Sequence, residues 1–141
     1  MEGRRSMNSD DGTLQQALDL AIHARNNAYA PYSNFKVGAA IVTSGKKIFS
    51  GCNVENASYG GTICAERGAI LAANAAGERD YRYIVVVTQA DPPSVPCALC
   101  LQVMAEFCRP DFEIILANPD GIHSKKTLGE LLPYPFNEVP G

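Results

Sequence analysis

Three cysteines and one glutamate stand at spacings that suit metal-assisted chemistry. Cys64 and Glu66 lie two residues apart at the start of an apolar segment, and Cys97 and Cys100 form a Cys-x-x-Cys pair further along. Three thiolates fill three corners of the tetrahedron that Zn²⁺ prefers and leave the fourth for water, as in a catalytic site. A carboxylate at Glu66 would lie beside that water and move protons. The spacing therefore predicts one zinc ion per chain, with Glu66 as proton carrier and not as ligand.

A structural zinc site is an alternative that the same cysteines leave open. Such a site needs a fourth protein ligand, and none of the candidates has the close paired spacing of a zinc finger or ribbon. Those candidates are His23, Cys52, Cys108 and His123. A structural site also has no use for a glutamate beside the metal, so Glu66 favours an enzyme.

Arg67 is a candidate for balancing the charge of the zinc site. Three thiolates around one Zn²⁺ leave a net charge of about −1, which weakens the metal as a Lewis acid and opposes ionisation of its water. Arg67 follows Glu66 directly. Its guanidinium could donate hydrogen bonds to the thiolates and restore that acidity. The alternative is a solvated surface arginine.

The pattern of apolar residues predicts the elements that hold these side chains. Apolar positions at three- and four-residue steps indicate a helix over residues 13–28 that begins with Thr13 as its cap, and two strand-like runs form a hairpin around residues 44–46. Further helices are predicted over residues 63–77, 97–108 and 127–133, buried strands over 83–89 and 112–118, and a short edge strand near Ile122. Cys64 and Cys97 thus open two helices, whose N-termini favour thiolates.

This order of elements indicates an α/β fold. Helices that alternate with buried strands after an initial hairpin predict three α/β/α layers, in which helices cover both faces of a mixed sheet of about five strands. A chain of 141 residues fits one domain. We expect that domain to span residues 13–141, after a flexible N-terminus over residues 1–12.

Composition and charge restrict the partners. The chain is 46% hydrophobic and 19% charged, and no apolar run approaches the roughly 20 residues that span a bilayer. Its polar start lacks the apolar stretch of a secretory signal, which predicts the cytoplasm and no membrane partner. A formal net charge of −3 gives no general attraction to phosphate backbones, which argues against nucleic acid as a partner.

The combination of motifs resembles the small zinc-dependent cytidine deaminases. A ligand-x-Glu followed by Pro-Cys-x-x-Cys is the signature of zinc nucleobase deaminases, and it stands here as Cys64-Ala65-Glu66 and Pro96-Cys97-Ala98-Leu99-Cys100. The segments PYSNFKVGAA, GCNVENASYG and KTLGELLP also resemble that family's segments, in the expected order. The resemblance runs from about residue 31 to residue 133.

The resemblance implies a function and a set of residue roles. The function is hydrolytic deamination of cytidine and deoxycytidine to uridine and deoxyuridine in pyrimidine salvage, with a zinc-bound hydroxide attacking C4 and ammonia leaving. The implied zinc ligands are Cys64, Cys97 and Cys100, the catalytic acid and base is Glu66, and the substrate-binding residues are Phe35, Asn53, Glu55 and Ala65. Phe35 would lie against the pyrimidine ring, Asn53 and Glu55 would hold ribose hydroxyls, and the backbone around Ala65 would help receive the base. The resemblance also implies a homotetramer whose subunits complete one another's active sites.

Two positions depart from the family pattern. The family commonly has Pro-Cys-x-x-Cys-Arg-Gln with a glycine inside it, whereas this chain has Ala98 and Leu101 and keeps Gln102. Loss of that arginine makes Arg67 the strongest remaining compensator of the zinc site's charge. A deaminase-fold relative that acts on another amine-bearing base or a nucleoside antibiotic therefore stays open.

Overall fold

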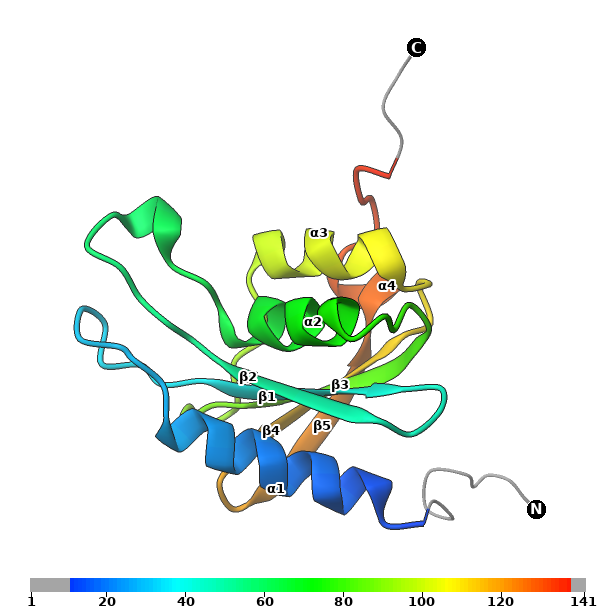
Figure 1. Ribbon diagram of the computed structural model, residues 1–141, viewed down its shortest axis with the longest axis horizontal. Coiled ribbons are helices and arrows are strands. Elements are labelled where there is room, and N and C mark those ends of the chain that lie inside the picture. The colour runs from blue at the N-terminus through cyan, green and yellow to red at the C-terminus, as the bar shows by residue number, and fades with distance from the viewer. Residues whose placement is uncertain (1–10, 138–141) are drawn as a thin grey trace.

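A five-stranded mixed sheet lies at the centre of the computed structural model, which describes residues 11–137 (Figure 1). The strands follow the order β2-β1-β3-β4-β5, and their bounds are β1 (Gly38–Thr43), β2 (Ile48–Cys52), β3 (Tyr81–Val87), β4 (Glu113–Asn118) and β5 (Gly121–Thr127). Strands β3 and β4 are parallel, and all other neighbours are antiparallel. The predicted mixed sheet and its initial hairpin, β1 and β2, are confirmed.

Helices cover both faces of this sheet, as predicted. In Figure 1, α1 (Thr13–Asn26) lies below the sheet, whereas α2 (Ala65–Ala75), α3 (Ala98–Phe107) and α4 (Leu128–Leu131) lie above it. Each face has its own apolar core, and β3 contributes to both: Ile84 and Val86 join the core under α2 and α3, and Val85 and Val87 join the core over α1. Because successive side chains point to opposite faces and both faces are covered, β3 is a continuous run of buried residues from Tyr83 to Val87. None of the described helices has the length and apolar character needed to cross a membrane.

The helix ends follow the sequence signals in part. Thr127 caps α4 through a capping box with Glu130, and Gly77 follows α2 with a φ of 91°. The prediction that Thr13 caps α1 is wrong. Gly12 is the cap, with a φ of 90°, while Thr13 is already helical and its hydroxyl donates to the Asp11 carboxylate. Of the segment predicted to be flexible, residues 1–10 lie outside the described residues.

The hairpin and α2 approach each other closely at Gly51. A Cβ atom built on Gly51 would lie 2.5 Å from the nitrogen of Ala69 and 2.7 Å from the carbonyl oxygen of Ala65. Only a residue without a Cβ lets β2 run this close to the backbone of α2. The contact fixes the height of α2 above the sheet, and α2 is the helix that carries Glu66 in its first turn.

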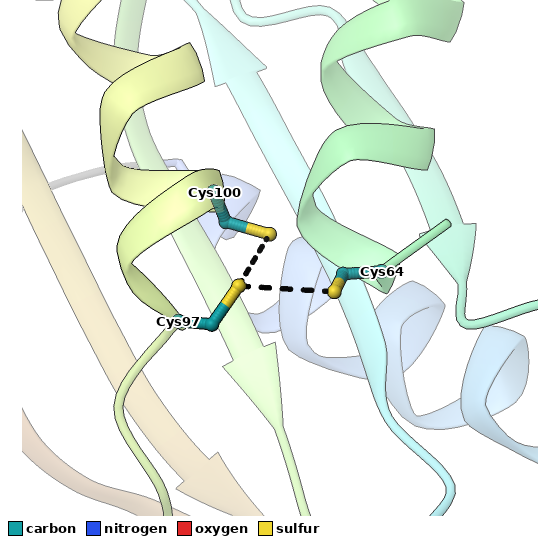
Figure 2. Close-up of side chains that lie close together, drawn as sticks. All are labelled: Cys64, Cys97 and Cys100. Carbon is teal, nitrogen blue, oxygen red and sulfur yellow. Dashed lines mark hydrogen bonds between the residues drawn. The ribbon is translucent and has the colours of Figure 1, made fainter. Parts of the chain in front are cut away.

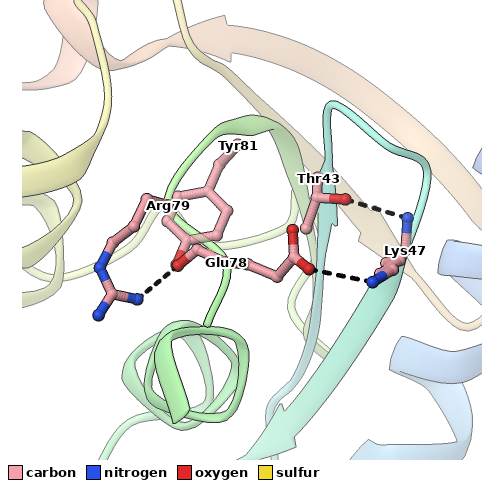
Figure 3. A network of polar contacts seen from close by, with 5 residues as sticks. All are labelled: Thr43, Lys47, Glu78, Arg79 and Tyr81. Atoms are coloured by element: carbon pink, nitrogen blue, oxygen red, sulfur yellow. Dashed lines mark hydrogen bonds and ion pairs between the residues drawn. The ribbon is translucent and has the colours of Figure 1, made fainter. Parts of the chain in front are cut away.

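The far end of α2 is tied to the same hairpin by polar contacts (Figure 3). The ammonium of Lys47 lies 3.3 Å from the Glu78 carboxylate, and the Lys47 amide donates to the Thr43 hydroxyl. The hydroxyl of Tyr81 and the guanidinium of Arg79 both donate to the backbone carbonyl of Glu78. An exposed ion pair stabilises a fold by only about 0–1 kcal/mol. Together, the contacts of Lys47, Arg79 and Tyr81 with Glu78 hold the connection between α2 and β3 in place.

Candidate active site

Three cysteine sulfurs converge where α2 and α3 begin (Figure 2). Cys64 and Cys97 are the N-caps of the two helices, and Cys100 lies in the first turn of α3. The Cys97 sulfur lies 3.9 Å from that of Cys64 and 3.5 Å from that of Cys100, and all three lie within 4.8 Å of one another. Within residues 11–137, no other cysteine, histidine, aspartate or glutamate joins this group. The group offers three ligands and not four.

Arg67 lies against this sulfur group from within α2. Its Nη2 atom is 3.4 Å from the Cys64 sulfur and 3.3 Å from the carbonyl oxygen of Thr62, so it donates to both. A hydrogen bond from the Cys100 thiol and the nearby Arg67 guanidinium lower the pKa of Cys64 to about 5. The same contact with Cys64 raises the pKa of Arg67. The predicted position of Arg67 beside the thiolates is the one found, whereas its influence on zinc stays a prediction.

Glu66 is a buried carboxylate beside the sulfur group. Its side chain is only 5% exposed, and burial raises its pKa to about 7, with the Cys64 thiolate adding to the effect and Arg67 opposing it. A general acid and base works best when its pKa lies near the operating pH. Its carboxylate does not join the group of three sulfurs, and Glu66 lines the same cavity as Cys64 and Cys97.

A cavity of about 260 Å³ opens next to Glu66 and two of the cysteines. The predicted site residues Phe35, Asn53, Glu55 and Ala65 all contribute to its wall, together with Cys64, Glu66 and Cys97. Cys100 and Arg67 are not among its lining residues. The cavity thus brings together five separate segments of the chain, residues 33–37, 53–55, 62–66, 86–88 and 94–97. Its wall contains the predicted sugar-binding residues and two of the three cysteines.

The amide of Asn53 is already used for structure. Asn53 is 7% exposed, its Oδ1 atom accepts from the Val37 amide at 2.8 Å, and its Nδ2 atom donates to the Phe35 carbonyl at 2.8 Å. A carboxamide has two lone pairs and two N–H bonds, so one of each stays available. Asn53 therefore fixes the segment that presents Phe35 and can still contact a ligand.

The carboxylate of Glu55 is held by the loop that precedes Phe35. Its Oε1 atom accepts from the amides of Tyr32 and Ser33 at 2.9 and 3.1 Å, and its Oε2 atom accepts from the Ser33 hydroxyl. The hydroxyl of Ser33, helped by both amides, lowers the pKa of Glu55. Glu55 is therefore ionised at neutral pH and can accept hydrogen bonds but not donate them.

Comparison with known proteins identifies the family. A model described as the cytidine and deoxycytidylate deaminase zinc-binding region matches residues 11–115. The chain belongs to this deaminase family. It is 46% identical over 122 residues to cytidine deaminase of Halalkalibacterium halodurans, and the matched region covers 86% of this chain and 92% of that protein. It is 41% identical over 133 residues to a probable cytidine deaminase of Dictyostelium discoideum, covering 94% of this chain and 88% of that protein.

Solved structures agree with this assignment. The crystal structure of cytidine deaminase from Burkholderia pseudomallei is 49% identical and matches with a TM-score of 0.82 over 86% of this chain and 98% of that chain. The crystal structure of cytidine deaminase from Mycobacterium leprae is 37% identical, with a TM-score of 0.72 over 86% and 98% of the two chains. The predicted three-layer fold of this deaminase family is therefore confirmed.

The sulfur group fits the zinc ion that this family requires. Thiolates are soft ligands that select zinc, and helix N-termini favour their charged form. The low pKa of Cys64 and the nearby guanidinium of Arg67 prepare the group for a cation without a fourth protein ligand. The zinc cofactor predicted from the cysteine spacing is thus supported by both the family and the donor set.

The departure at Leu101 is explained by its packing. Leu101 is 5% exposed and lies in the apolar core beneath α2 and α3. An apolar side chain suits this buried position of the deaminase, where an arginine is common in the family. Ala98 is exposed in the first turn of α3. Arg67 is the cation that contacts a cysteine sulfur within the described residues.

Several wall residues of this deaminase cavity were missed by sequence reasoning. They are Ser33, Val37, Thr62, Val86, Thr88, Ser94 and Val95. Thr88 is 2% exposed, directly follows β3, and its hydroxyl accepts from the Ser94 amide at 3.2 Å. A polar residue at the carboxyl end of a buried parallel strand is a usual position for a site residue, and that signal could have found Thr88. Val86 lies in β3, and the others depend on loop conformation.

Proposed function

We propose that this chain deaminates cytidine and deoxycytidine by hydrolysis, giving uridine or deoxyuridine and ammonia. One observation carries the proposal: a single cavity is lined by the buried acid Glu66, by two of the three converging cysteines, and by Phe35, Asn53 and Glu55. At about 260 Å³ the cavity lies near the lower end of the range for small-molecule sites, about 300 Å³. That size suits one nucleoside.

Cys64, Cys97 and Cys100 hold the zinc ion in this proposal. Zinc at such a site supplies a Lewis acid that lowers the pKa of water far enough to make a nucleophile at neutral pH. Three protein ligands leave a position for that water, which is the mark of catalytic zinc. The helix N-termini that carry these cysteines help to stabilise their thiolates.

Glu66 moves the protons of the reaction. Its carboxylate takes a proton from the attacking water and gives it to N3 of the cytosine ring. It then takes the proton of the new hydroxyl at C4 and passes it to the departing amine. Burial supports this role because it raises the pKa of Glu66 to about 7, where either protonation state is accessible at neutral pH. One carboxylate can then serve as base and afterwards as acid.

The remaining wall positions the nucleoside. Phe35 lies against the pyrimidine ring, and the backbone around Ala65 at the start of α2 helps to receive the base. Asn53 has one N–H and one lone pair to offer to a sugar hydroxyl, and Glu55 accepts from one. The ionised Glu55 would repel a nearby 5′-phosphate, so the substrate is a free nucleoside and not a nucleotide or nucleic acid.

Arg67 balances the charge of the thiolates. Its contact with the Cys64 sulfur at 3.4 Å supports this role. With Leu101 at the position where an arginine is common, Arg67 is left to offset the negative charge and keep the metal acidic.

The assembly, location and extent of the protein complete the proposal. It is a cytoplasmic homotetramer that acts in pyrimidine salvage, and its subunits contribute to one another's active sites. Exposed aromatic side chains beside the cavity support association, since Tyr32 is 52% exposed and Tyr59 is 78% exposed. Residues 13–141 form the deaminase domain. Size-exclusion chromatography with light scattering tests the assembly, and a stable, active monomer would refute it.

The activity itself is tested on purified protein. Absorbance follows the conversion of cytidine and deoxycytidine, an ammonia assay follows the second product, and metal analysis gives the zinc content of the same sample. We expect turnover of both nucleosides with about one zinc per chain. Cytidine 5′-monophosphate serves as the matched control and should turn over poorly. Protein that holds zinc but leaves both nucleosides unchanged would refute the assignment.

A further inference from the structure

Ser33 joins the two sides of the cavity that hold the nucleoside. Its hydroxyl donates to the Oε2 atom of Glu55, which lies 22 residues away in the sequence, and accepts from the Phe35 amide at 3.0 Å. Its own amide donates to the Oε1 atom of Glu55 at 3.1 Å. Ser33 also lines the cavity wall. One residue thus contacts the proposed sugar-binding carboxylate and the residue proposed to cover the base.

The hydrogen bonds of Glu55 limit how it meets a sugar. An ionised carboxylate offers about four acceptor positions, and three are occupied by the two loop amides and the Ser33 hydroxyl. Both amides bond Oε1, so the position that stays available is on Oε2. That oxygen is the one oriented by the Ser33 hydroxyl. A sugar hydroxyl that donates to Glu55 therefore donates to an atom whose direction Ser33 sets.

From these contacts we propose that Ser33 is a positioning residue for the sugar of the nucleoside, acting through Glu55. This inference rests on the proposed function, since it assigns Glu55 to the sugar. Without the hydroxyl, Oε2 loses its partner, and only the two amide contacts to Oε1 oppose rotation about the terminal torsion, which has a broad range. The lowered pKa of Glu55 agrees with this arrangement, because the Ser33 hydroxyl is its largest cause.

Ser33→Ala tests the proposal in the full-length, zinc-loaded protein. Hydrogen bonds to charged groups are strong enough that we expect the KM for cytidine to rise about tenfold, with kcat changed by less than about threefold. Ser33→Thr retains a hydroxyl and should restore most of the affinity. Ser44→Ala, at an exposed position in the hairpin turn, is the matched control and should behave as the wild type.

A second readout separates a sugar contact from a general change in the loop. Calorimetry measures the binding of cytidine and of 2′,3′-dideoxycytidine, which lacks the 2′ and 3′ hydroxyls and keeps the 5′ hydroxyl, in a Glu66→Gln background. Ser33→Ala should weaken cytidine about tenfold and change the dideoxynucleoside by less than about twofold. Equal weakening of both ligands, or of neither, would overturn the role of Ser33.

The two proposals fail in different ways. If the zinc-loaded wild type binds cytidine without deaminating it, the proposed function is refuted, and the ratio of the two binding changes still decides the role of Ser33. If the wild type deaminates cytidine but Ser33→Ala has the same kinetics as Ser44→Ala, only the role of Ser33 is refuted. A wild type that neither binds nor deaminates cytidine overturns both.

Discussion

Replacing Gly51 by alanine tests whether the contact between β2 and α2 holds the catalytic helix in place. The new Cβ would lie 2.5 Å from the Ala69 nitrogen, 2.7 Å from the Ala65 oxygen and 2.8 Å from the carbonyl carbon of Gly68. Real Cβ atoms essentially never approach another heavy atom within 3.0 Å. All three atoms belong to the backbone of α2, so no change of side-chain rotamer relieves the overlap.

The size of the effect follows from these distances. Ordinary contact between carbon atoms is about 3.5–4.0 Å, so α2 must move away from the sheet by about 1 Å. Overpacking of a core costs about 1–3 kcal/mol, and a displaced backbone puts Gly51→Ala at the upper end. A loss of about 3 kcal/mol lowers the Tm of a chain of this length by about 10 °C. Because Glu66 moves with α2, kcat/KM should also fall by about a hundredfold.

Two other glycines provide matched controls for this experiment. A Cβ on Gly45, in the turn of the same hairpin, meets only the Thr43 hydroxyl at 3.8 Å. A Cβ on Gly68, across the contact from Gly51, would lie 3.6 Å from the Gly51 Cα atom, which is an ordinary distance. Gly68→Ala should stabilise α2 by up to about 1 kcal/mol through helix propensity. Thermal unfolding, cytidine turnover and zinc content are measured for all three variants.

The result that refutes this reasoning is specific. If Gly51→Ala unfolds at the wild-type Tm and keeps full turnover, the close contact does not position α2. If Gly68→Ala lowers the Tm and the turnover as much as Gly51→Ala, the Cβ distances do not explain the effect. The contact between β2 and α2 would then tolerate an added carbon on neither side.

Three further predictions concern charged and titratable groups. Glu66→Gln should lower kcat by about a hundred- to ten-thousandfold with unchanged zinc content, because an amide of the same shape cannot carry protons. Arg67→Ala should lower the zinc content or kcat severely, because the Cys64 sulfur loses its cationic partner, and metal analysis with cytidine kinetics measures this. Burial raises the pKa of Cys108 from 9.0 to about 12, so the folded state keeps a proton that the unfolded state loses. The free energy of unfolding, measured with urea, should therefore decrease as the pH rises through this range, and Cys108→Ala should flatten that dependence.

Each of these predictions has a control and a contrary outcome. Glu106→Gln, on the exposed side of α3, should keep normal turnover, and near-normal turnover in Glu66→Gln would remove that residue from the mechanism. Arg82→Ala, at an exposed arginine of β3, is the control for Arg67→Ala, and equal zinc content and kinetics in the two variants would refute the charge argument. An unchanged pH dependence in Cys108→Ala would show that its thiol does not contribute.

The elements that carry the chemistry could be predicted because their signals are local. The apolar run of β3 and the Cys-x-x-Cys pair before α3 are visible in the sequence, since burial on both faces requires continuous apolar residues and a metal requires ligands at fixed spacing. The bounds of the edge strand β5 were harder to predict from the sequence. Its residues alternate little, it contains His123, Lys125 and Lys126, and its existence depends on pairing with β4 along most of its length.

The cavity wall could be predicted only where a motif marked it. The family resemblance implies roles for Phe35 and Glu55. It implied none for Ser33, although Ser33 stands in the same segment as Phe35, or for Thr88, and both are hydroxyl residues of common types. Their importance arises from contacts across 22 residues in one case and from a position at the end of a buried strand in the other. Tertiary contacts of this kind leave no periodicity. Thr13 shows the same limit, because a threonine next to a helix start can cap the helix or turn to Asp11.

The position of Glu66 depends on its helix end and on the sheet beneath. The N-terminus of α2 favours the thiolate of Cys64, and the approach of Gly51 brings α2 down onto the sheet, which buries Glu66 and raises its pKa. A helix held higher would expose the carboxylate to water and return its pKa towards the ordinary value. In the proposed mechanism, the pKa of the proton carrier Glu66 is therefore tuned by backbone packing at Gly51, which does not line the cavity. Loss of stability and loss of catalysis should appear together when that packing is disturbed.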